Sequence, residues 1–309
     1  MTRQAAVVTG GAGFIGTNLA PALRDRGWTT IAFDNGSTGN LDDAAKVFDD
    51  VIEGDILEPS QLKAVLDGAS VVVHLAAQSG VPSSVADPLR DHELNSRGTL
   101  QTLLAARDAG ITSFVFASSN APLGAAPVPS HEGVVPRPLS PYGASKLAGE
   151  AYCSAFAGSY GLRTVALRFA NVYGPLSYHK GSVIATFMKA VMDGEPLMID
   201  GDGLQTRDFV YVGDLCEGVA AAAESDLKGD VLHLGSGTET SVIDVAETIA
   251  SMFADRELQI EHGPSRAGDV RHSRSDITRA RQLLGYAPSV DLADGLARTR
   301  EWFLTQKPS

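Results

Sequence analysis

The sequence predicts an α/β fold in which a doubly wound parallel sheet is followed by a smaller, mixed α/β lobe. Three observations support this fold. Short apolar runs alternate with helical stretches through the first two-thirds of the 309 residues, the runs at 71–75 and 114–117 are almost continuously apolar, and a glycine-rich turn follows the first run. Strands that alternate with helices indicate parallel pairing with helices on both faces. Continuously apolar strands are typical of a sheet buried in this way.

The elements follow one another in a regular order up to about residue 175. The strands expected in the sheet are 5–9, 29–34, 51–55, 70–76, 113–118 and 163–169, and the helices include 14–26, 93–109 and 141–160. Beyond 175 the rhythm changes to helical stretches at 182–193, 212–225, 241–254 and 291–304, with short strands such as 197–200 and 231–235. We therefore predict one domain at 1–174, to which some later segments return, and a second lobe at 175–309.

Composition excludes several classes of function. The net charge of −12 argues against nucleic acid as a partner, because binding it needs a basic field. The two cysteines, Cys153 and Cys216, stand among small and apolar residues and suggest neither a disulfide framework nor a metal site. No apolar run reaches the roughly 18 residues of a membrane span. We expect a cytoplasmic protein without metal or membrane contact, in which a few local groups hold any anionic ligand.

The glycine-rich turn has the context of a dinucleotide site. Gly10, Gly13 and Gly16 stand three residues apart between a strand and a helix, and the next strand ends at Asp34. Glycine lets backbone N–H groups and the positive end of the helix dipole approach a pyrophosphate. A carboxylate at the second strand end accepts hydrogen bonds from ribose hydroxyls and repels a 2′-phosphate. The pattern predicts that a Rossmann-type domain at 1–174 binds NAD rather than NADP.

A tyrosine and a lysine stand where this cofactor would react. Tyr142 and Lys146 are four residues apart at the start of the expected helix 141–160, and so share one face. A phenol with a pKa of about 10 is a poor base at neutral pH, but a neighbouring ammonium and the charge of a nicotinamide ring favour the phenolate. Ser118 and Ser119 follow the fifth strand, at the sheet edge where ligands bind. We predict acid/base chemistry there.

Seven motifs in order carry a resemblance to a known family. They are TGGAGFIG at 9–16, DN at 34–35, HLAA at 74–77, SSN at 118–120, SPYGASK at 140–146, NVYGP at 171–175 and GDGLQTRDFVYVGD at 201–214. Together they resemble the extended short-chain dehydrogenase/reductases that act on nucleotide sugars. Within these, the chain is most similar to NAD-dependent UDP-sugar 4-epimerases of the UDP-galactose 4-epimerase type.

The resemblance implies roles for the residues at the reacting centre. It makes Tyr142 the acid/base for the sugar 4-hydroxyl, Lys146 the residue that tunes it and positions the nicotinamide ribose, and Ser119 the bridge to that hydroxyl. Ser119 is preferred over Ser118 because the family's hydroxyl residue stands five positions before a closing glycine, here Gly124.

It also implies the residues that bind the two ligands. The cofactor-binding set is Gly10, Gly13, Phe14, Ile15, Gly16, Asp34, Asn35, Asp55, Ile56, Leu75, Ala76, Ala77, Asn95, Tyr142 and Lys146. In this set Asp55 and Ile56 flank the adenine, and Asn95 supports the lysine. The substrate-binding set is Ser119, Asn120, Tyr142, Asn171, Arg207, Arg266 and Asp269. Two arginines and Asn171 grip the diphosphate, with Asp269 near the uridine ribose; guanidinium forks suit phosphate oxygens.

The segment after Ser119 departs from the family pattern. Members usually show Val-Tyr-Gly where this chain has Pro-Leu-Gly at 122–124. Sugar dehydratases carry an Asp-Glu pair directly after the catalytic hydroxyl residue, one to protonate the leaving group and one to remove a carbon-bound proton. Asn120 and Ala121 can do neither, which argues against 4,6-dehydration.

The resulting hypothesis is a 4-epimerase that inverts C4 of a UDP-hexose through a transient 4-keto sugar. UDP-glucuronate 4-epimerisation stays open, because His179 and Lys180 begin the family's sugar-contacting loop and either meet a carboxylate or lie in solvent. Another NAD-dependent nucleotide-sugar dehydratase or decarboxylase, and a non-catalytic NAD-binding sensor, are further alternatives. The resemblance implies a homodimer formed through 93–109 and 141–160. His74 is expected to fill a strand end.

Overall fold

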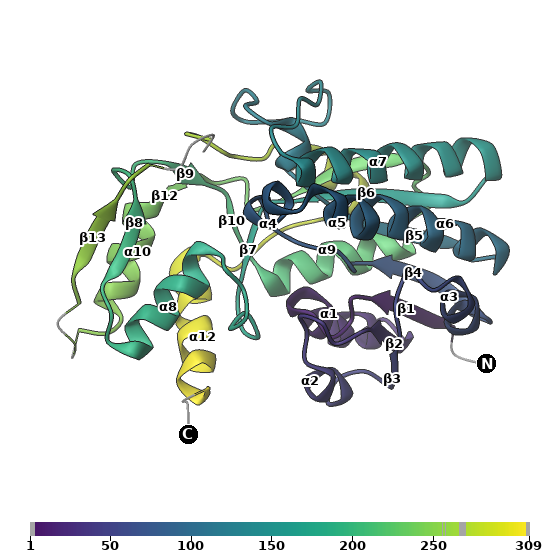
Figure 1. Ribbon diagram of the computed structural model, residues 1–309, viewed down its shortest axis with the longest axis horizontal. Helices are drawn as coiled ribbons and strands as arrows, with labels where there is room; N and C mark the ends of the chain where they lie inside the picture. Colours follow the sequence, from purple (N-terminus) through teal and green to yellow (C-terminus); the bar gives the residue numbers. More distant parts are fainter. Residues whose placement is uncertain (1–3, 255, 257, 266–269, 307–309) are drawn as a thin grey trace.

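The protein is built around a seven-stranded parallel sheet (Figure 1). The computed structural model describes residues 4–254, 256, 258–265 and 270–306. The strands are β1 (Ala5–Thr9), β2 (Thr29–Asp34), β3 (Asp50–Glu53), β4 (Ala69–His74), β5 (Ser113–Ser119), β6 (Arg163–Phe169) and β11 (Asp230–Leu234). Their order is β11-β6-β5-β4-β1-β2-β3, so the winding direction reverses between β1 and β4. At such a switch point the carboxyl ends of the strands bind ligands. The predicted doubly wound α/β fold is confirmed.

Helices cover both faces of the sheet because alternate strand residues point to opposite sides. The covering helices are α1 (Phe14–Asp25), α3 (Pro59–Leu66), α6 (Gly98–Asp108), α7 (Pro141–Tyr160) and α9 (Val212–Glu224). On β4, Val71 and Val73 belong to the core formed with α1 and α9, whereas Val72 belongs to the core formed with α3, α6 and α7. Shorter helices complete this domain: α2 (Leu41–Ala45), α4 (Val81–Ala86), α5 (Pro88–Asp91) and α11 (Thr278–Leu284).

Two elements that follow residue 175 return to this sheet. Sequence analysis grouped 212–225 and 231–235 with the later, irregular elements. In the structure α9 packs against α1, and β11 pairs in parallel with β6, where Leu232 stands opposite Leu167. This pairing covers an edge of β6 whose backbone groups would otherwise lie open.

Three other elements differ locally from the prediction. The strands expected at 51–55 and 70–76 end at Glu53 and His74, since the following residues turn away to line a cavity. The helix expected at 93–109 begins with a wide π-helical turn at His92–Arg97 before it continues as α6.

The smaller lobe has its own apolar core. Its elements are α8 (Val183–Asp193), α10 (Val242–Ser251), α12 (Leu292–Thr305) and three strand pairs, which are β7 (Asn171–Tyr173) with β10 (Phe209–Tyr211), β8 (Leu197–Asp200) with β13 (Ile260–Gly263), and β9 (Thr206–Arg207) with β12 (Thr240–Ser241). Fully buried Phe187, Ile249 and Phe303 bring the three helices together. The predicted helices at 182–193, 241–254 and 291–304 are confirmed. No helix in the described part of the chain is long and apolar enough to cross a membrane.

A buried ion pair attaches α7 to the sheet. Arg168 on β6 donates through Nε and Nη2 to the two carboxylate oxygens of Glu150, at 2.9 and 2.7 Å. Ser118 at the end of β5 donates to the same carboxylate at 2.6 Å. Both charged side chains are nearly inaccessible to water, at 3 % and 5 % exposure. This pair therefore fixes the position of α7 over the carboxyl ends of β5 and β6.

Replacing Arg168 by methionine tests this attachment. Arg168→Met leaves the Glu150 carboxylate buried without its cation, which is expected to lower the free energy of unfolding by about 3–5 kcal/mol. The double variant Arg168→Met with Glu150→Gln removes both charges and is expected to recover much of that loss. Urea unfolding measures the free energy of unfolding of the single and the double variant. The exposed pair of Arg97 with Glu93 is the control, because Arg97→Met should cost no more than about 0.5 kcal/mol. A loss below 1 kcal/mol for Arg168→Met contradicts the account.

Candidate active site

A cavity of about 1850 Å³ collects residues from the sheet edge and from the smaller lobe. Eighteen of the predicted site residues line it: Gly10, Gly13, Phe14, Ile15, Gly16, Asp34, Asn35, Asp55, Ile56, Leu75, Ala76, Ala77, Ser119, Asn120, Tyr142, Lys146, Asn171 and Arg207. They come together because the carboxyl ends of parallel strands meet at one edge. Arg266 and Asp269 lie outside the described residues.

The glycine turn forms a cradle that only glycine allows. A Cβ on Gly10, whose φ is 72°, would stand 2.6 Å from the backbone nitrogen of Ala76, and one on Gly16 would stand 2.6 Å from the Gly10 carbonyl oxygen. Gly13 caps α1 without any side-chain acceptor, so the first-turn N–H groups of Phe14 and Ile15 are not capped by a side chain. The turn therefore fits a pyrophosphate placed on the helix N-terminus.

Hydrogen bonds around Asp34 hold the end of the second strand in place. The Asp34 carboxylate accepts from the backbone nitrogens of Ala12 at 3.0 Å and Gly36 at 2.9 Å. Burial raises the pKa of Asp34, and these hydrogen bonds oppose that rise. The next residue, Asn35, donates to the Asp55 carboxylate at 3.2 Å. The two acids predicted to contact the ribose and the adenine thus lie at one end of the cavity.

The start of α7 places the predicted acid/base group. Ser140 caps the helix by accepting from the Gly143 N–H at 3.1 Å, and Pro141 occupies the first turn. Lys146, one turn further on, donates from Nζ to the Ala117 carbonyl of β5 at 2.8 Å. The same Nζ lies 5.9 Å from the centre of the Tyr142 ring. Helix and strand therefore bring the phenol and the ammonium to the sheet edge together.

The two serines at the end of β5 point to different partners. Ser118 is 3 % exposed and donates to Glu150, so its hydroxyl belongs to the buried ion pair. Ser119 hydrogen-bonds to the Tyr142 phenol and also accepts from the backbone N–H of Ala121 at 3.2 Å. This arrangement favours Ser119 as the hydroxyl that works with Tyr142.

Burial shifts the pKa values of both Tyr142 and Lys146. It raises the pKa of Tyr142 to about 12, against the effect of the Ser119 hydrogen bond, and lowers the pKa of Lys146 to about 8, against the attraction of Asp91. Lys146 by itself does not make the phenolate favourable, because the loss of hydration around Tyr142 outweighs the effect of its charge. A further positive charge close to the ring is needed to bring the phenolate within reach.

Asn95 does not line the cavity. Its amide donates to the Gln78 carbonyl at 2.9 Å and to Asp91 at 2.8 Å, and its oxygen accepts from the Gln78 N–H at 2.8 Å. Asn95 thereby holds the loop after β4, and its predicted support of Lys146 through the backbone or water stays a prediction. His74 fills the end of β4 as expected, between Thr9 at 2.7 Å and Thr99 at 3.0 Å, and burial lowers its pKa to about 3.

Asn120 uses its side chain inside the protein. Its oxygen lies 3.1 Å from Nδ1 of the buried His233, and its nitrogen donates to the Ser275 hydroxyl at 3.1 Å. The residues after it, Ala121–Leu123, form a short 3₁₀ turn in which Pro122 and Leu123 are buried. The predicted substrate contact of Asn120 stays a prediction, and its amide supplies neither acid nor base.

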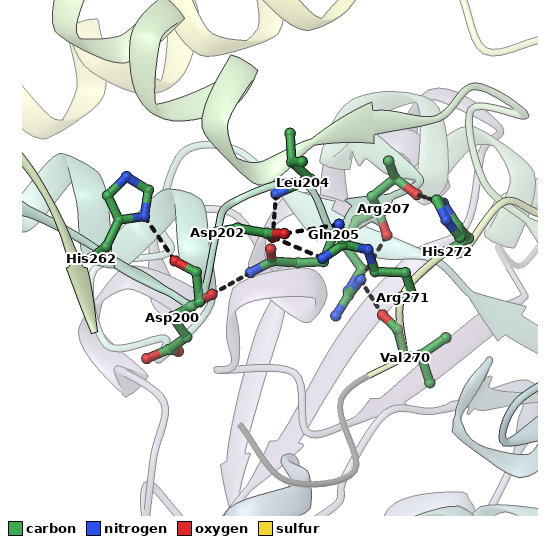
Figure 2. Close-up of polar contacts among 11 residues, drawn as sticks. Asp200, Asp202, Leu204, Gln205, Arg207, His262, Val270, Arg271 and His272 are labelled. Atoms are coloured by element: carbon green, nitrogen blue, oxygen red, sulfur yellow. Dashed lines mark hydrogen bonds and ion pairs between the residues drawn. The ribbon is translucent and has the colours of Figure 1, made fainter. Parts of the chain in front are cut away.

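Arg207 lines the cavity, and Figure 2 shows its polar contacts. It donates from Nη1 to the carbonyl oxygens of Thr206 and Val270, each at 2.7 Å. Nearby, Arg271 forms an ion pair with Asp202 at 2.7 Å. Asn171 begins β7, where its backbone N–H donates to the Asp208 carbonyl at 2.8 Å.

The structure places the side chains of His179 and Lys180 in different surroundings. His179 is exposed at the mouth of the cavity, as the solvent alternative stated. Lys180 instead points inward, with Nζ 4.6 Å from the centre of the Phe14 ring, and burial lowers its pKa to about 8. The solvent alternative is therefore wrong for Lys180. Sequence reasoning also missed the pair of Glu150 with Arg168, for which no local pattern gave a signal.

Comparisons with known proteins find relatives over nearly the whole chain. The model of the NAD dependent epimerase/dehydratase family matches residues 6–235. A putative UDP-glucose 4-epimerase of Methanocaldococcus jannaschii is 37% identical over 304 residues, covering 96% of this chain and 97% of that protein. The UDP-glucose 4-epimerase of Mycolicibacterium smegmatis is 36% identical over 306 residues, with coverage of 96% and 97%. A crystal structure of Thermotoga maritima UDP-glucose 4-epimerase with UDP-glucose superposes with a TM-score of 0.92 at 34% identity, covering 98% of this chain and 99% of that one.

Lys146→Met is expected to make the protein more stable at neutral pH. Lowering the pKa of Lys146 from 10.5 to about 8 corresponds to roughly 3 kcal/mol of unfavourable free energy, and losing its bond to Ala117 offsets about 1 kcal/mol. Because the folded-state pKa lies below that of the unfolded chain, the penalty is full below about pH 8 and shrinks as the pH rises toward 10.5.

Urea unfolding of wild type and Lys146→Met at pH 7 and at about pH 10 measures this effect. We expect a gain of about 1–3 kcal/mol at pH 7 that becomes smaller at the higher pH. A variant that is less stable than wild type at pH 7 contradicts the assignment of Lys146 as a buried, destabilised ammonium.

Proposed function

This chain belongs to the NAD dependent epimerase/dehydratase family, and we propose that it inverts C4 of a UDP-hexose of the UDP-glucose/UDP-galactose type. The observation that carries the proposal is the convergence of three groups at one edge of the sheet. The Tyr142 phenol, the Ser119 hydroxyl and the Lys146 ammonium meet in the cavity that the glycine turn also lines. The relatives named above are described as UDP-glucose 4-epimerases, which supports this substrate class.

The residues present fit NAD as the cofactor. The uncapped N-terminus of α1 suits its diphosphate, Asp34 suits the adenosine ribose, and Lys146 with Tyr142 suits the nicotinamide ribose. When bound, NAD supplies an acceptor that takes the C4 hydride and later returns it, so that no net oxidation occurs. In this proposal residues 1–174 mainly bind NAD, and 175–309 mainly bind the nucleotide sugar.

Tyr142 moves the proton of the reaction. Its Oη, as phenolate, removes the proton of the sugar 4-hydroxyl and returns it to the 4-oxygen once the opposite face of C4 has been reduced. Ser119 bridges Oη and the 4-hydroxyl, and Lys146 contributes positive charge one turn away. The buried phenol of Tyr142, with a pKa of about 12, requires a further positive charge, which a bound nicotinamide ring in its cationic form would supply.

Inversion needs the hexosyl group to turn while its nucleotide stays bound. Arg207 and Asn171, which line the cavity, grip the diphosphate in this proposal together with Arg266, and Asp269 contacts the uridine ribose. Arg207 is suited to the task because two backbone carbonyls fix its orientation. The sugar is then free to present either face of C4 to the cofactor.

The proposal favours epimerisation of UDP-glucose over the alternative functions. The Asn120 amide is bonded to His233 and Ser275, and the side chain of Ala121 is a methyl group, so neither supplies the acid and base of 4,6-dehydration. UDP-glucuronate is the alternative substrate, since it needs the same chemistry at C4. A non-catalytic NAD-binding sensor would not need the proton-transfer group formed by Ser119, Tyr142 and Lys146.

We further propose a cytoplasmic homodimer that uses the helices around α6 and α7. Support comes from Leu89, which is exposed by 78% on α5, a helix that packs against α7. Val81 and Val85 on α4 are exposed by 45% and 62%, and they also line the cavity. Such exposed apolar residues on neighbouring turns are typical of a contact surface. Light scattering after size-exclusion chromatography measures the mass, and a monomer at micromolar concentration contradicts this part of the proposal.

Tyr142→Phe tests the acid/base role. The substitution removes only the hydroxyl, so turnover of UDP-glucose is expected to fall by about 10²- to 10⁴-fold while bound NAD is retained. NMR of the anomeric proton follows the conversion, and the absorbance of released cofactor gives the NAD content. Tyr152→Phe, on the same helix but outside the cavity, is the matched control and should keep full activity. Undiminished turnover by Tyr142→Phe contradicts the role.

A substrate panel decides between the alternatives. Purified protein is incubated separately with UDP-glucose, UDP-glucuronate and UDP-N-acetylglucosamine, first without and then with added NAD. We expect UDP-glucose to convert to its 4-epimer. Conversion of UDP-glucuronate alone favours the alternative substrate, and conversion of none favours a sensor.

A further inference from the structure

The segment 174–182, between β7 and α8, folds back over α1. Pro175 accepts a hydrogen bond from Asn18 of α1 at 3.1 Å. Inside the segment, the Ser177 hydroxyl donates to the Gly174 carbonyl at 2.6 Å, and the Lys180 N–H donates to the Ser177 carbonyl at 2.9 Å. Leu176, with φ of 68°, is the one non-glycine residue with a left-handed backbone in the described part of the chain. A backbone of this kind persists only where its surroundings hold it.

Lys180 points from this segment to the glycine turn. Its Nζ donates to the Val172 carbonyl at 3.3 Å and lies 4.6 Å from the centre of the Phe14 ring. Phe14 is the first residue of α1 and directly follows the glycine cap at Gly13. A cation of the smaller lobe therefore lies beside the N-terminus whose N–H groups suit a pyrophosphate.

This ammonium has no carboxylate partner among the described residues. Its recorded polar contact is the Val172 carbonyl, a neutral acceptor for one of its three N–H donors. Burial lowers its pKa to about 8, with no opposing attraction from an acid. The chain carries 37 acidic residues, yet none of the described ones compensates this site. Lys180 as a residue is half-buried, and a charge that loses hydration is unfavourable unless an opposite charge joins it, so the position suits an anionic ligand.

Two of the other three cations that line the cavity in the described residues are directed elsewhere. The three are Lys146, Arg207 and Arg274. Lys146 donates to Ala117 of β5, and Arg207 donates to Thr206 and Val270. Lys180 is the one among them with a recorded contact to the glycine turn.

We propose that the Lys180 ammonium binds the diphosphate of the dinucleotide from the smaller lobe, opposite the N–H groups of α1. The inference rests on the proposed function only in taking this dinucleotide to be NAD. A diphosphate held between a helix N-terminus and a lysine of the other lobe leaves only when segment 174–182 moves. The site thereby retains a cofactor that is oxidised and reduced again within each turnover. The diphosphate of the UDP-sugar has the same chemistry, and the experiment separates the two.

The experiment measures binding rather than turnover. Three full-length variants are compared with wild type: Lys180→Met, Lys180→Arg and Lys189→Met. Lys189 is the matched control, because it donates to the Lys180 carbonyl from α8 but lies outside the cavity. For each protein, the NAD carried through purification is quantified after denaturation, and the Kd values for NAD and for UDP are measured by titration calorimetry.

In Lys180→Met we expect the Kd for NAD to rise by about 10-fold or more, since a charge-assisted hydrogen bond is lost, while the Kd for UDP stays within about 2-fold. Lys180→Arg should recover most of the NAD affinity, and Lys189→Met should resemble wild type. If Lys180→Met does not fold, Lys180→Gln takes its place.

Unchanged NAD affinity in Lys180→Met overturns the inference, and so does a loss confined to UDP, which assigns the ammonium to the sugar nucleotide. The proposed function fails separately if wild type binds no NAD or converts no UDP-sugar. The ratio of the variant and wild-type Kd values addresses Lys180 alone.

Discussion

The attachment of α7 to the carboxyl ends of β5 and β6 is the constraint on which the site depends. Tyr142, Lys146 and Glu150 are spaced four residues apart along this helix, so they share the face that meets the sheet. The ion pair of Glu150 with Arg168 and the bond of Lys146 to Ala117 fix two successive turns of that face. The remaining turn then carries Tyr142 to Ser119. The groups that we propose to transfer the proton are thus positioned by buried polar contacts between α7 and the sheet.

Burial also explains the unusual protonation of these groups. Excluding water raises the pKa of Tyr142 and lowers the pKa of Lys146, so the protein alone favours a neutral phenol. The same exclusion strengthens the effect of any charge that enters the cavity. The pKa of Tyr142 would therefore respond to the charge of a nicotinamide ring bound beside it. An acidic protein can host two diphosphates in this cavity because it places a few cations there individually.

Local patterns in the sequence were enough for much of this account. The apolar runs predict the first six strands of the sheet, since strand formation follows from short-range composition. Gly10, Gly13 and Gly16 predict the cradle, because the backbone approach there tolerates no Cβ. The spacing of Tyr142 and Lys146 predicts their common face.

Features that depend on long-range contacts were not predictable in this way. The short run at 231–235 carries no sign that it pairs with β6, and Arg168 carries no sign that it meets Glu150. Asn95 is of a residue type that often contacts ligands, but its side chain hydrogen-bonds the backbone of Gln78. The directions of His179 and Lys180 depend on how segment 174–182 packs on α1, which neighbouring residues do not determine.

The central claim is that Tyr142, Ser119 and the cofactor held by the glycine turn act on the same sugar carbon. Turnover of UDP-glucose that carries deuterium at C4, in ordinary water, tests this most directly. The account predicts that the 4-epimer keeps the deuterium at C4, since the hydride leaves for NAD and returns without meeting solvent. Loss of the label to water would contradict it, because inversion would then proceed through a proton rather than a hydride.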